Sequence, residues 1–287
     1  MRLKEDTYVS AAGSRTFRKH YMPEEGVPVL GIAVFVHGLG DHGSRYGRVL
    51  ERFVQRGVYC IAPDLPGHGR SEGTRGFIPS MDAVHSIIGE NLAHLQSLYS
   101  GVPAGILGHS MGGFFALDHV SRHPEGIHFC WASSPLIDAS GHRGKVMQTT
   151  ARLLSRLAPT FSIHSGIRSG ACRRDPERIL ETENDPLMHR RLSMRLGQRL
   201  LNATAQLPDT VTGMNPELRL LITHGSADTI CPTALSQSLF PMLPAKQKRY
   251  ALLDGLLHEP FNDIGRDAFY RELNSWLDAT IPFIGLP

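Results

Sequence analysis

A glycine-flanked serine constrains this chain more than any other feature of its sequence. The stretch 108–112 reads Gly-His-Ser-Met-Gly; it follows small and branched apolar residues at 104–107 and precedes apolar residues at helical spacing over 111–120. A serine at such a strand-to-helix break lies on a turn so tight that its flanking residues must lack side chains. Glycine-flanked serines also occur by chance in a chain with 29 glycines. The strand before and the helix after this one favour a nucleophile elbow that holds the Ser110 hydroxyl above a sheet.

Strand and helix patterns alternate along most of the chain. A hairpin is predicted at 7–12 and 15–21, and continuous apolar runs then predict buried strands separated by helical patterns. A strand, a helix and a second strand in this order imply a right-handed crossover and a parallel sheet. We therefore predict an α/β fold with a mostly parallel central sheet flanked by helices. The further predicted strands are 29–36, 58–62, 104–107, 127–132, 218–223 and 249–253, and the predicted helices are 45–55, 81–98, 111–120, 232–240 and 266–279.

The alternation of strands and helices stops between residues 135 and 200. No buried strand is apparent there, and helical patterns at 146–157 and 185–201 predict an inserted helical lid. A chain of 287 residues is long enough for one large core, so a single α/β domain with an insertion fits better than two domains. The predicted core is 1–134 and 201–287, and the predicted lid (cap) is 135–200.

Composition and charge exclude several classes of protein. A formal net charge of +3 gives no general case for nucleic-acid binding. The four cysteines form no CxxC pair and no zinc-ligand spacing, so we expect neither a disulfide framework nor a structural metal. The charged N-terminus does not resemble a signal peptide, and no apolar run approaches the roughly 20 residues that span a bilayer. We expect a cytoplasmic protein that requires no cofactor and no metal.

Three residues predicted to follow strands have the chemistry of a catalytic triad. In open α/β sheets functional groups gather beyond the carboxyl ends of the strands, where Ser110, Asp228 and His258 are expected. Serine needs an imidazole to take its proton, and the imidazole needs a carboxylate to fix its tautomer. The chain order serine, aspartate, histidine is that of α/β-hydrolases. Taken singly, the aspartate is also explained as a turn residue and the histidine as one of 15 on the chain.

A negative charge that develops on a carbonyl oxygen requires two fixed donors. The fold supplies them as backbone amides from the residue after the nucleophile and from a loop after an early strand. These are Met111 and Leu39, and Gly38 and Gly40 allow the second amide to turn inward. Ordinary loop chemistry is the alternative explanation of the glycines.

Five short motifs carry a resemblance to a known family, and they are His-Gly-Leu-Gly at 37–40, Gly-His-Gly-Arg-Ser-Glu-Gly at 67–73, Gly-His-Ser-Met-Gly-Gly at 108–113, His-Gly-Ser-Ala-Asp at 224–228 and Gly-Leu-Leu-His-Glu-Pro at 255–260. From about residue 30 to 277 the chain resembles the monoacylglycerol lipase and lysophospholipase group of serine α/β-hydrolases. The resemblance implies an α/β-hydrolase fold. It also implies that Ser110 is the nucleophile and that Asp228 and His258 are its partners. The same resemblance implies that Leu39 and Met111 are the oxyanion donors.

The resemblance extends to the polar end of the site, where this chain also differs from the family at two positions. It implies that Asp41 and Arg45 help to organise this end and bind substrate. The chain carries aspartate at 41 where monoacylglycerol lipases typically carry glutamate, and Thr182 where a lid tyrosine is expected. Cys231 matches a cysteine near the site in monoacylglycerol lipases. A small buried residue at a helix start is the simpler explanation of this cysteine.

The lid combines basic residues with apolar ones. Leu153, Leu154 and Leu157 are predicted to line an acyl tunnel and so to bind substrate, although they also fit a lid core. The arginines, among them Arg152 and Arg190, fit an ordinary solvated surface. They also fit peripheral contact with membranes or lipid aggregates.

The sequence thus predicts a serine carboxylic-ester hydrolase that acts through an acyl-enzyme on small single-chain lipid esters such as monoacylglycerols or lysophospholipids. A peptidase or amidase, or a general carboxylesterase, would use the same triad. A ligand receptor on a hydrolase scaffold is the non-enzymatic alternative, against which the three triad residues argue.

Overall fold

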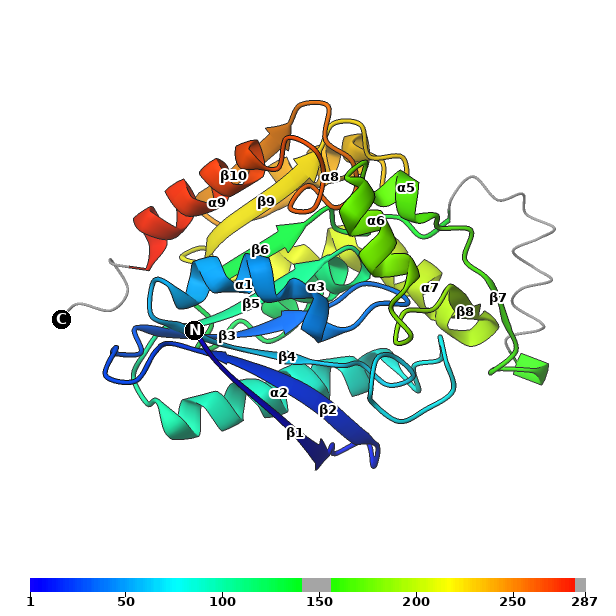
Figure 1. The fold of residues 1–287 in the computed structure, drawn as a ribbon, viewed down its shortest axis with the longest axis horizontal. Helices are drawn as coiled ribbons and strands as arrows, with labels where there is room; N and C mark the ends of the chain where they lie inside the picture. Colours follow the sequence, from blue (N-terminus) through cyan, green and yellow to red (C-terminus); the bar gives the residue numbers. More distant parts are fainter. Residues whose placement is uncertain (141–155, 282–287) are drawn as a thin grey trace.

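Eight strands form one sheet in the order β1-β2-β4-β3-β5-β6-β9-β10 in the computed structural model, which describes residues 1–140 and 156–281 (Figure 1). The first three strands pair antiparallel, and from β4 to β10 every pair is parallel. The mostly parallel sheet is therefore confirmed. The strands are β1 (Arg2–Val9), β2 (Arg15–Met22), β3 (Gly31–Val36), β4 (Val58–Pro63), β5 (Ala104–His109), β6 (Phe129–Ser133), β9 (Arg219–Gly225) and β10 (Gln247–Leu253).

The N-terminal hairpin is present, but its first strand lies earlier than predicted. The strand β1 ends at Val9, and residues 10–14 form the turn, in which Gly13 has a φ of 78°. The register pairs Val9 with Arg15 and Arg2 with Met22. Because β2 needs an equally long partner, β1 extends back into the charged residues near the N-terminus, where periodicity gave no strand signal.

Helices cover both faces of the sheet, as the alternation of strand and helix patterns predicted. Along β3 the side chains of Ile32 and Val36 join one core with α2 and α3, and Phe35 joins a second core with α1 and α9. Both faces are buried, which explains the continuous apolar runs of the central strands. The helices that cover the two faces are α1 (Gly47–Val54), α2 (Met81–Leu98), α3 (Met111–Arg122), α8 (Thr233–Leu239) and α9 (Asp267–Thr280).

The inserted segment lies at the carboxyl-end edge of the sheet (Figure 1). Its described elements are β7 (Ser162–His164), α5 (Ser169–Cys172), α6 (Pro176–Glu183), β8 (Arg191–Ser193) and the first turns of α7 (Met194–Thr210). The antiparallel pair of β7 and β8 is short and mostly exposed. Most of the predicted helix at 146–157 falls outside the described residues.

The predicted helix at 185–201 is wrong at both ends. The Asp185 carboxylate accepts the amide of Leu187 and forms a turn, and β8 then pairs with β7. The helix α7 begins only after Ser193, whose hydroxyl caps it by accepting the Leu196 amide at 3.2 Å. It continues to Thr210, so the predicted boundary between lid and core at residue 200 falls inside one helix.

The apolar face of α7 explains why the helix continues past that boundary. Leu196, Leu200 and Leu207 are at most 4% exposed and belong to the same core as α3. Burial of this face stabilises α7 more than helix propensity alone would. Among the described residues, no helix combines the length and the apolar character needed to cross a bilayer.

The packing of α7 predicts different costs for two leucines of the inserted segment. Leu196→Ala removes a fully buried side chain and should lower the free energy of unfolding by about 2–5 kcal/mol. Leu180→Ala, in α6, should change it by less than about 0.5 kcal/mol because Leu180 is 59% exposed. Urea unfolding of both variants measures the difference. Equal costs would contradict the assignment of the start of α7 to the core.

Candidate active site

Ser110 lies on a strained turn between β5 and α3. Its φ of 57° and ψ of −120° are rare for a residue with a side chain. A Cβ on Gly108 would lie 2.1 Å from the Gly112 carbonyl oxygen, and a Cβ on Gly112 would lie 2.0 Å from that of Val36. Neither contact is tolerable, so both glycines are required. The turn that the sequence predicted is therefore present.

The structure brings Ser110, His258 and Asp228 together. They follow the ends of β5, β10 and β9, three strands of the parallel part of the sheet. The Ser110 hydroxyl lies 2.9 Å from Nε2 of His258, and Nδ1 of His258 lies 2.7 Å from Oδ2 of Asp228. Because the carboxylate only accepts, we assign the imidazole proton to Nδ1, which leaves Nε2 to accept from the serine.

Four donors hold the Asp228 carboxylate. The amides of Ile230 and Cys231 donate to Oδ1 at 2.8 and 3.0 Å, and Nε2 of His224 lies 3.1 Å from Oδ2. Burial alone would raise the pKa of Asp228, but the charge of His258 and these hydrogen bonds hold it well below its ordinary value. The carboxylate therefore stays ionised beside the imidazole.

His224 is a supporting residue that sequence reasoning missed. Its Nε2 also lies 2.9 Å from the carbonyl oxygen of Cys231, and its Nδ1 lies 2.7 Å from the hydroxyl of Ser236. The ring thus helps to hold Oδ2 of Asp228, the oxygen that also accepts from His258. Its spacing of four residues from Asp228 was a visible signal, but the pattern alone does not distinguish it from other histidines at strand ends.

Leu39 and Met111, the residues predicted to supply the oxyanion amides, lie near Ser110. Met111 is the first residue of α3, and both residues line the same pocket as Ser110. His37 fixes the other loop, because its Nδ1 donates to the Gly38 carbonyl at 2.8 Å and its Nε2 accepts the Leu65 amide at 2.9 Å. These two hydrogen bonds fix the loop that carries Leu39.

Two pockets meet at Ser110, and Leu39 lines both. The surface of the first is mainly apolar, and most of the residues that line the second are polar or charged. The apolar pocket is lined by Met111, Leu136, Ala139, Ile163, Leu192, Met194, Leu200, Leu201, Ile230 and Cys231, among others. The polar pocket includes Asp41, Ser165, Ser169, Arg173, Thr182, Glu183, Asp185, His189, Arg190, His258 and Glu259.

The apolar pocket is not lined as the sequence predicted. Leu157 is 74% exposed and does not line it, because the side chain faces solvent just before the turn at 158–161. Leu153 and Leu154 lie outside the described residues. The pocket is lined instead by Leu136 and Ala139 and by residues of β7, β8 and α7, with Ile163, Leu192 and Leu201 among them.

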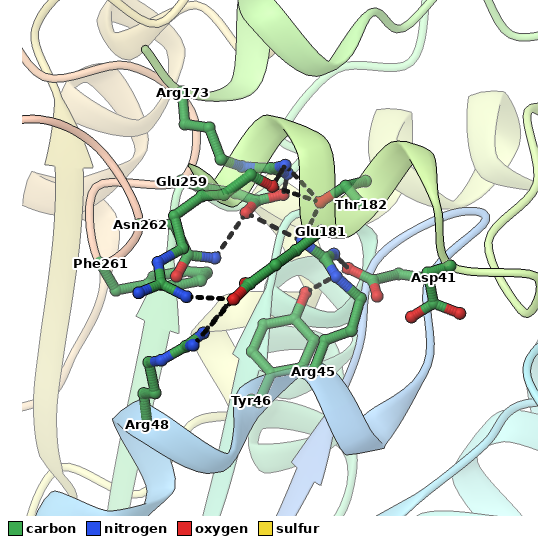
Figure 2. Close-up of polar contacts among 12 residues, drawn as sticks. Asp41, Arg45, Tyr46, Arg48, Arg173, Glu181, Thr182, Glu259, Phe261 and Asn262 are labelled. Carbon is green, nitrogen blue, oxygen red and sulfur yellow. Dashed lines mark hydrogen bonds and ion pairs between the residues drawn. The ribbon is translucent and has the colours of Figure 1, made fainter. Parts of the chain in front are cut away.

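A buried ion network borders the polar pocket (Figure 2). Arg45 lies at its centre. One guanidinium nitrogen donates to Asp41 at 2.7 Å, and the other lies 2.9 Å from the Thr182 hydroxyl and 3.4 Å from Glu259. Asp41 also accepts from the Tyr46 hydroxyl at 2.8 Å. The predicted substrate-binding residues Asp41 and Arg45 are thus bound to each other and to the lid.

Arg173, which directly follows α5, completes this network. It donates to Glu259 and, at 2.5 Å, to the Thr182 hydroxyl, and its side chain is 1% exposed. Burial alone would raise the pKa of Glu259, but the charges of Arg45 and Arg173 hold it well below its ordinary value. Glu259 directly follows His258, so the network connects the lid to the histidine loop.

Comparison with known proteins identifies the family. The family model described as serine aminopeptidase S33 (Hydrolase_4) matches residues 28–265. The chain belongs to this α/β-hydrolase family. A monoacylglycerol lipase of Mycolicibacterium smegmatis is 26% identical over 95% of this chain and 96% of its own length. An abhydrolase domain-containing protein of Dictyostelium discoideum is 30% identical over 89% of this chain, which corresponds to 27% of the longer protein.

Solved structures confirm the α/β-hydrolase fold. The crystal structure of a monoacylglycerol lipase from Paleococcus ferrophilus is 30% identical and covers 92% of this chain and 99% of its own, with a TM-score of 0.83. The resemblance to the monoacylglycerol lipase group of serine α/β-hydrolases is thus confirmed over nearly the whole chain, as is membership of an enzyme family.

Many basic residues of this hydrolase's lid are neutralised. Arg173 is paired with Glu259, Arg174 with Asp263, and Arg178 with Glu177 and Glu181. These ion pairs leave less free positive charge than the composition of the lid suggested.

The ion network predicts unequal costs for two arginines. Arg173→Met should lower the free energy of unfolding by about 3–5 kcal/mol, because it leaves the buried Glu259 with only the longer contact to Arg45 as an ion pair. Arg48→Met is the control, since the pair of Arg48 and Glu181 is about half exposed and should contribute at most about 1 kcal/mol. Urea unfolding at low ionic strength compares the two. If Arg173→Met were as stable as the wild type, the importance of the network would be contradicted.

Proposed function

We propose that the chain is a serine carboxylic-ester hydrolase that acts through an acyl-enzyme on single-chain lipid esters, such as monoacylglycerols or lysophospholipids. The observation that carries this proposal is the position of Ser110, where an apolar pocket and a polar pocket meet. An ester of a fatty acid with a polar alcohol has the same two halves on either side of its carbonyl carbon.

Each residue of the proposed triad has one task. His258 accepts the proton of Ser110 while the serine oxygen attacks the carbonyl carbon, and Asp228 stabilises the imidazolium that forms. The amides of Leu39 and Met111 donate to the oxyanion. The carbon–oxygen bond to the alcohol then breaks and His258 returns the proton to the leaving oxygen. Water, deprotonated by the same histidine, hydrolyses the acyl-serine.

The two pockets divide the substrate. Each methylene buried in the apolar pocket adds up to about 0.8 kcal/mol of binding. In the polar pocket the carboxylates of Asp41 and Glu259 are paired with arginines, and that of Asp185 lies 2.8 Å from Nε2 of His42. Because these carboxylates already have cationic or imidazole partners, the pocket favours an uncharged polyol as the alcohol part of the substrate. A polyol forms hydrogen bonds without requiring a free charge of opposite sign. Asp41 and Arg45 thus act on the substrate by shaping this pocket.

Aminopeptidase activity is the second candidate, since the family description names it. An aminopeptidase binds the ammonium group of its substrate and needs a carboxylate without another partner. The paired state of Asp41 and Glu259 favours an ester substrate instead. A receptor without activity is disfavoured by the 2.9 Å contact between Ser110 and His258.

We also propose that the lid residues preceding α7 contact lipid aggregates. Phe161 and Ile163 are 56% and 38% exposed, and Ile163 lines the apolar pocket. Arg191 is exposed on β8, and Arg168 is exposed in the segment that follows β7. Exposed apolar and basic side chains at a pocket entrance fit an anionic lipid surface.

All four cysteines are free, which supports a reducing compartment such as the cytoplasm.

Ser110→Ala should abolish ester hydrolysis while leaving the fold intact. With p-nitrophenyl esters, kcat/KM of the wild type should increase with acyl length by up to about fourfold per methylene, and the variant should lose at least about 10³-fold. Amino-acid p-nitroanilides should be poor substrates. Monoacylglycerol should be cleaved faster than lysophosphatidylcholine of the same acyl chain. Substantial activity of the variant, or a preference for the anilides, would overturn the proposal.

The lid proposal predicts a substrate-specific salt effect. Activity on an acylglycerol embedded in anionic vesicles should decrease between about 0.05 and about 0.5 M salt, because salt screens the attraction of exposed arginines to lipid. Activity on a short soluble ester should stay constant in the same series. Arg191→Gln should reduce the first activity only. Parallel salt responses of the two substrates would contradict lipid contact.

A further inference from the structure

Three histidines meet at the packing of α2 against α3, in a region separate from the Ser110 pockets. His85 lies on α2, and His119 and His123 lie one turn apart on α3, His123 as its C-cap. One ring nitrogen from each lies within 4.8 Å of the other two. The Nδ1 atoms of His85 and His119 are 3.1 Å apart. Two ligand nitrogens of a tetrahedral zinc ion lie about 3.3 Å apart, so this pair already has a ligating separation.

A carboxylate orients the first of these rings. Nε2 of His85 lies 2.9 Å from Oδ2 of Asp118, which also accepts from Nε of Arg122 at 2.9 Å. A carboxylate only accepts, so we assign the proton of His85 to Nε2 and the lone pair to Nδ1, the atom that faces the cluster. A histidine whose far nitrogen donates to a carboxylate is the usual arrangement around a protein-bound metal.

The rings of His119 and His123 are also suited to bind a metal ion. His119 is 4% exposed, so its ring is held in the packing between α2 and α3. His123 is exposed at the helix end, and its ring centroid lies 4.9 Å from that of His119. A surface hollow lined by Asp82, Glu125 and the three histidines gives access from solvent.

We propose that His85, His119 and His123 bind a divalent transition-metal ion of the zinc class, with Asp118 as the outer carboxylate and a fourth position open to the hollow. Imidazole nitrogens suit zinc, copper and nickel better than magnesium or calcium. The ion would connect α2 to α3, whose first residue follows Ser110. Since His123 lies at the opposite end of α3, the ion takes no part in the hydrolysis.

The test is metal binding to the whole chain after dialysis against a chelator. Zinc affinity is measured by competition with a chromophoric chelator, and cobalt substitution is followed by its absorption spectrum. The wild type should bind one ion. His123→Ala should weaken binding by more than about 100-fold, and Asp118→Asn by about 10–100-fold. His94→Ala, which removes a histidine of α2 outside the cluster, should bind like the wild type.

The readouts separate this site from adventitious binding to other histidines. His123 is exposed, so its alanine variant should fold, which circular dichroism confirms independently of metal. Saturating zinc should raise Tm of the wild type and of His94→Ala, but not of His123→Ala. No binding by the wild type would overturn the proposal. So would an affinity that His123→Ala leaves unchanged, because the ion would then be held elsewhere.

Discussion

The backbone of Ser110 is held in a rare conformation by close contact between β5, α3 and the end of β3. A side chain at Gly108 or Gly112 would overlap a carbonyl oxygen, so the turn exists only because both positions lack one. The strain at Ser110, with φ 57°, is tolerated because β5 and every residue of α3 except Arg122 are buried. This turn fixes where the hydroxyl lies, and the histidine, the candidate oxyanion amides and both pockets are arranged around it.

A second set of buried contacts connects the lid to that arrangement. Arg45 and Arg173 hold Thr182 of α6 and Glu259 of the histidine loop in one network (Figure 2). Charges removed from water require partners, and here each carboxylate has at least one guanidinium beside it. The same pairing that positions the lid leaves the polar pocket with few free charges, which connects the stability of the lid to the proposed choice of substrate.

The sequence predicted the parts of the fold whose patterns are local. Central strands buried on both faces read as continuous apolar runs, and α2 was predicted with its observed bounds. In the structure the Ser80 hydroxyl caps the start of this helix. The glycine pair, the chain order of Ser110, Asp228 and His258, and their places after strands indicated the site. The predicted helix at 185–201 began too early, because an Asx turn and the pairing of β8 override helical periodicity before residue 194.

Contacts between segments distant in sequence could not be predicted in this way. Arg173 reaches Glu259 across 86 positions. The histidine cluster was missed for the same reason, because His85 lies on a different helix from His119. Packing of α2 on α3 alone brings these rings together.

Covalent labelling tests whether His258 and Asp228 activate Ser110 as a nucleophile. A fluorophosphonate should form one adduct per chain, located on Ser110 by mass spectrometry of peptides. His258→Ala should slow labelling on the order of 10³-fold, and Asp228→Asn should slow it similarly, with the fold preserved in both. Labelling of another residue, or labelling of Ser110 at the wild-type rate without His258, would contradict the account.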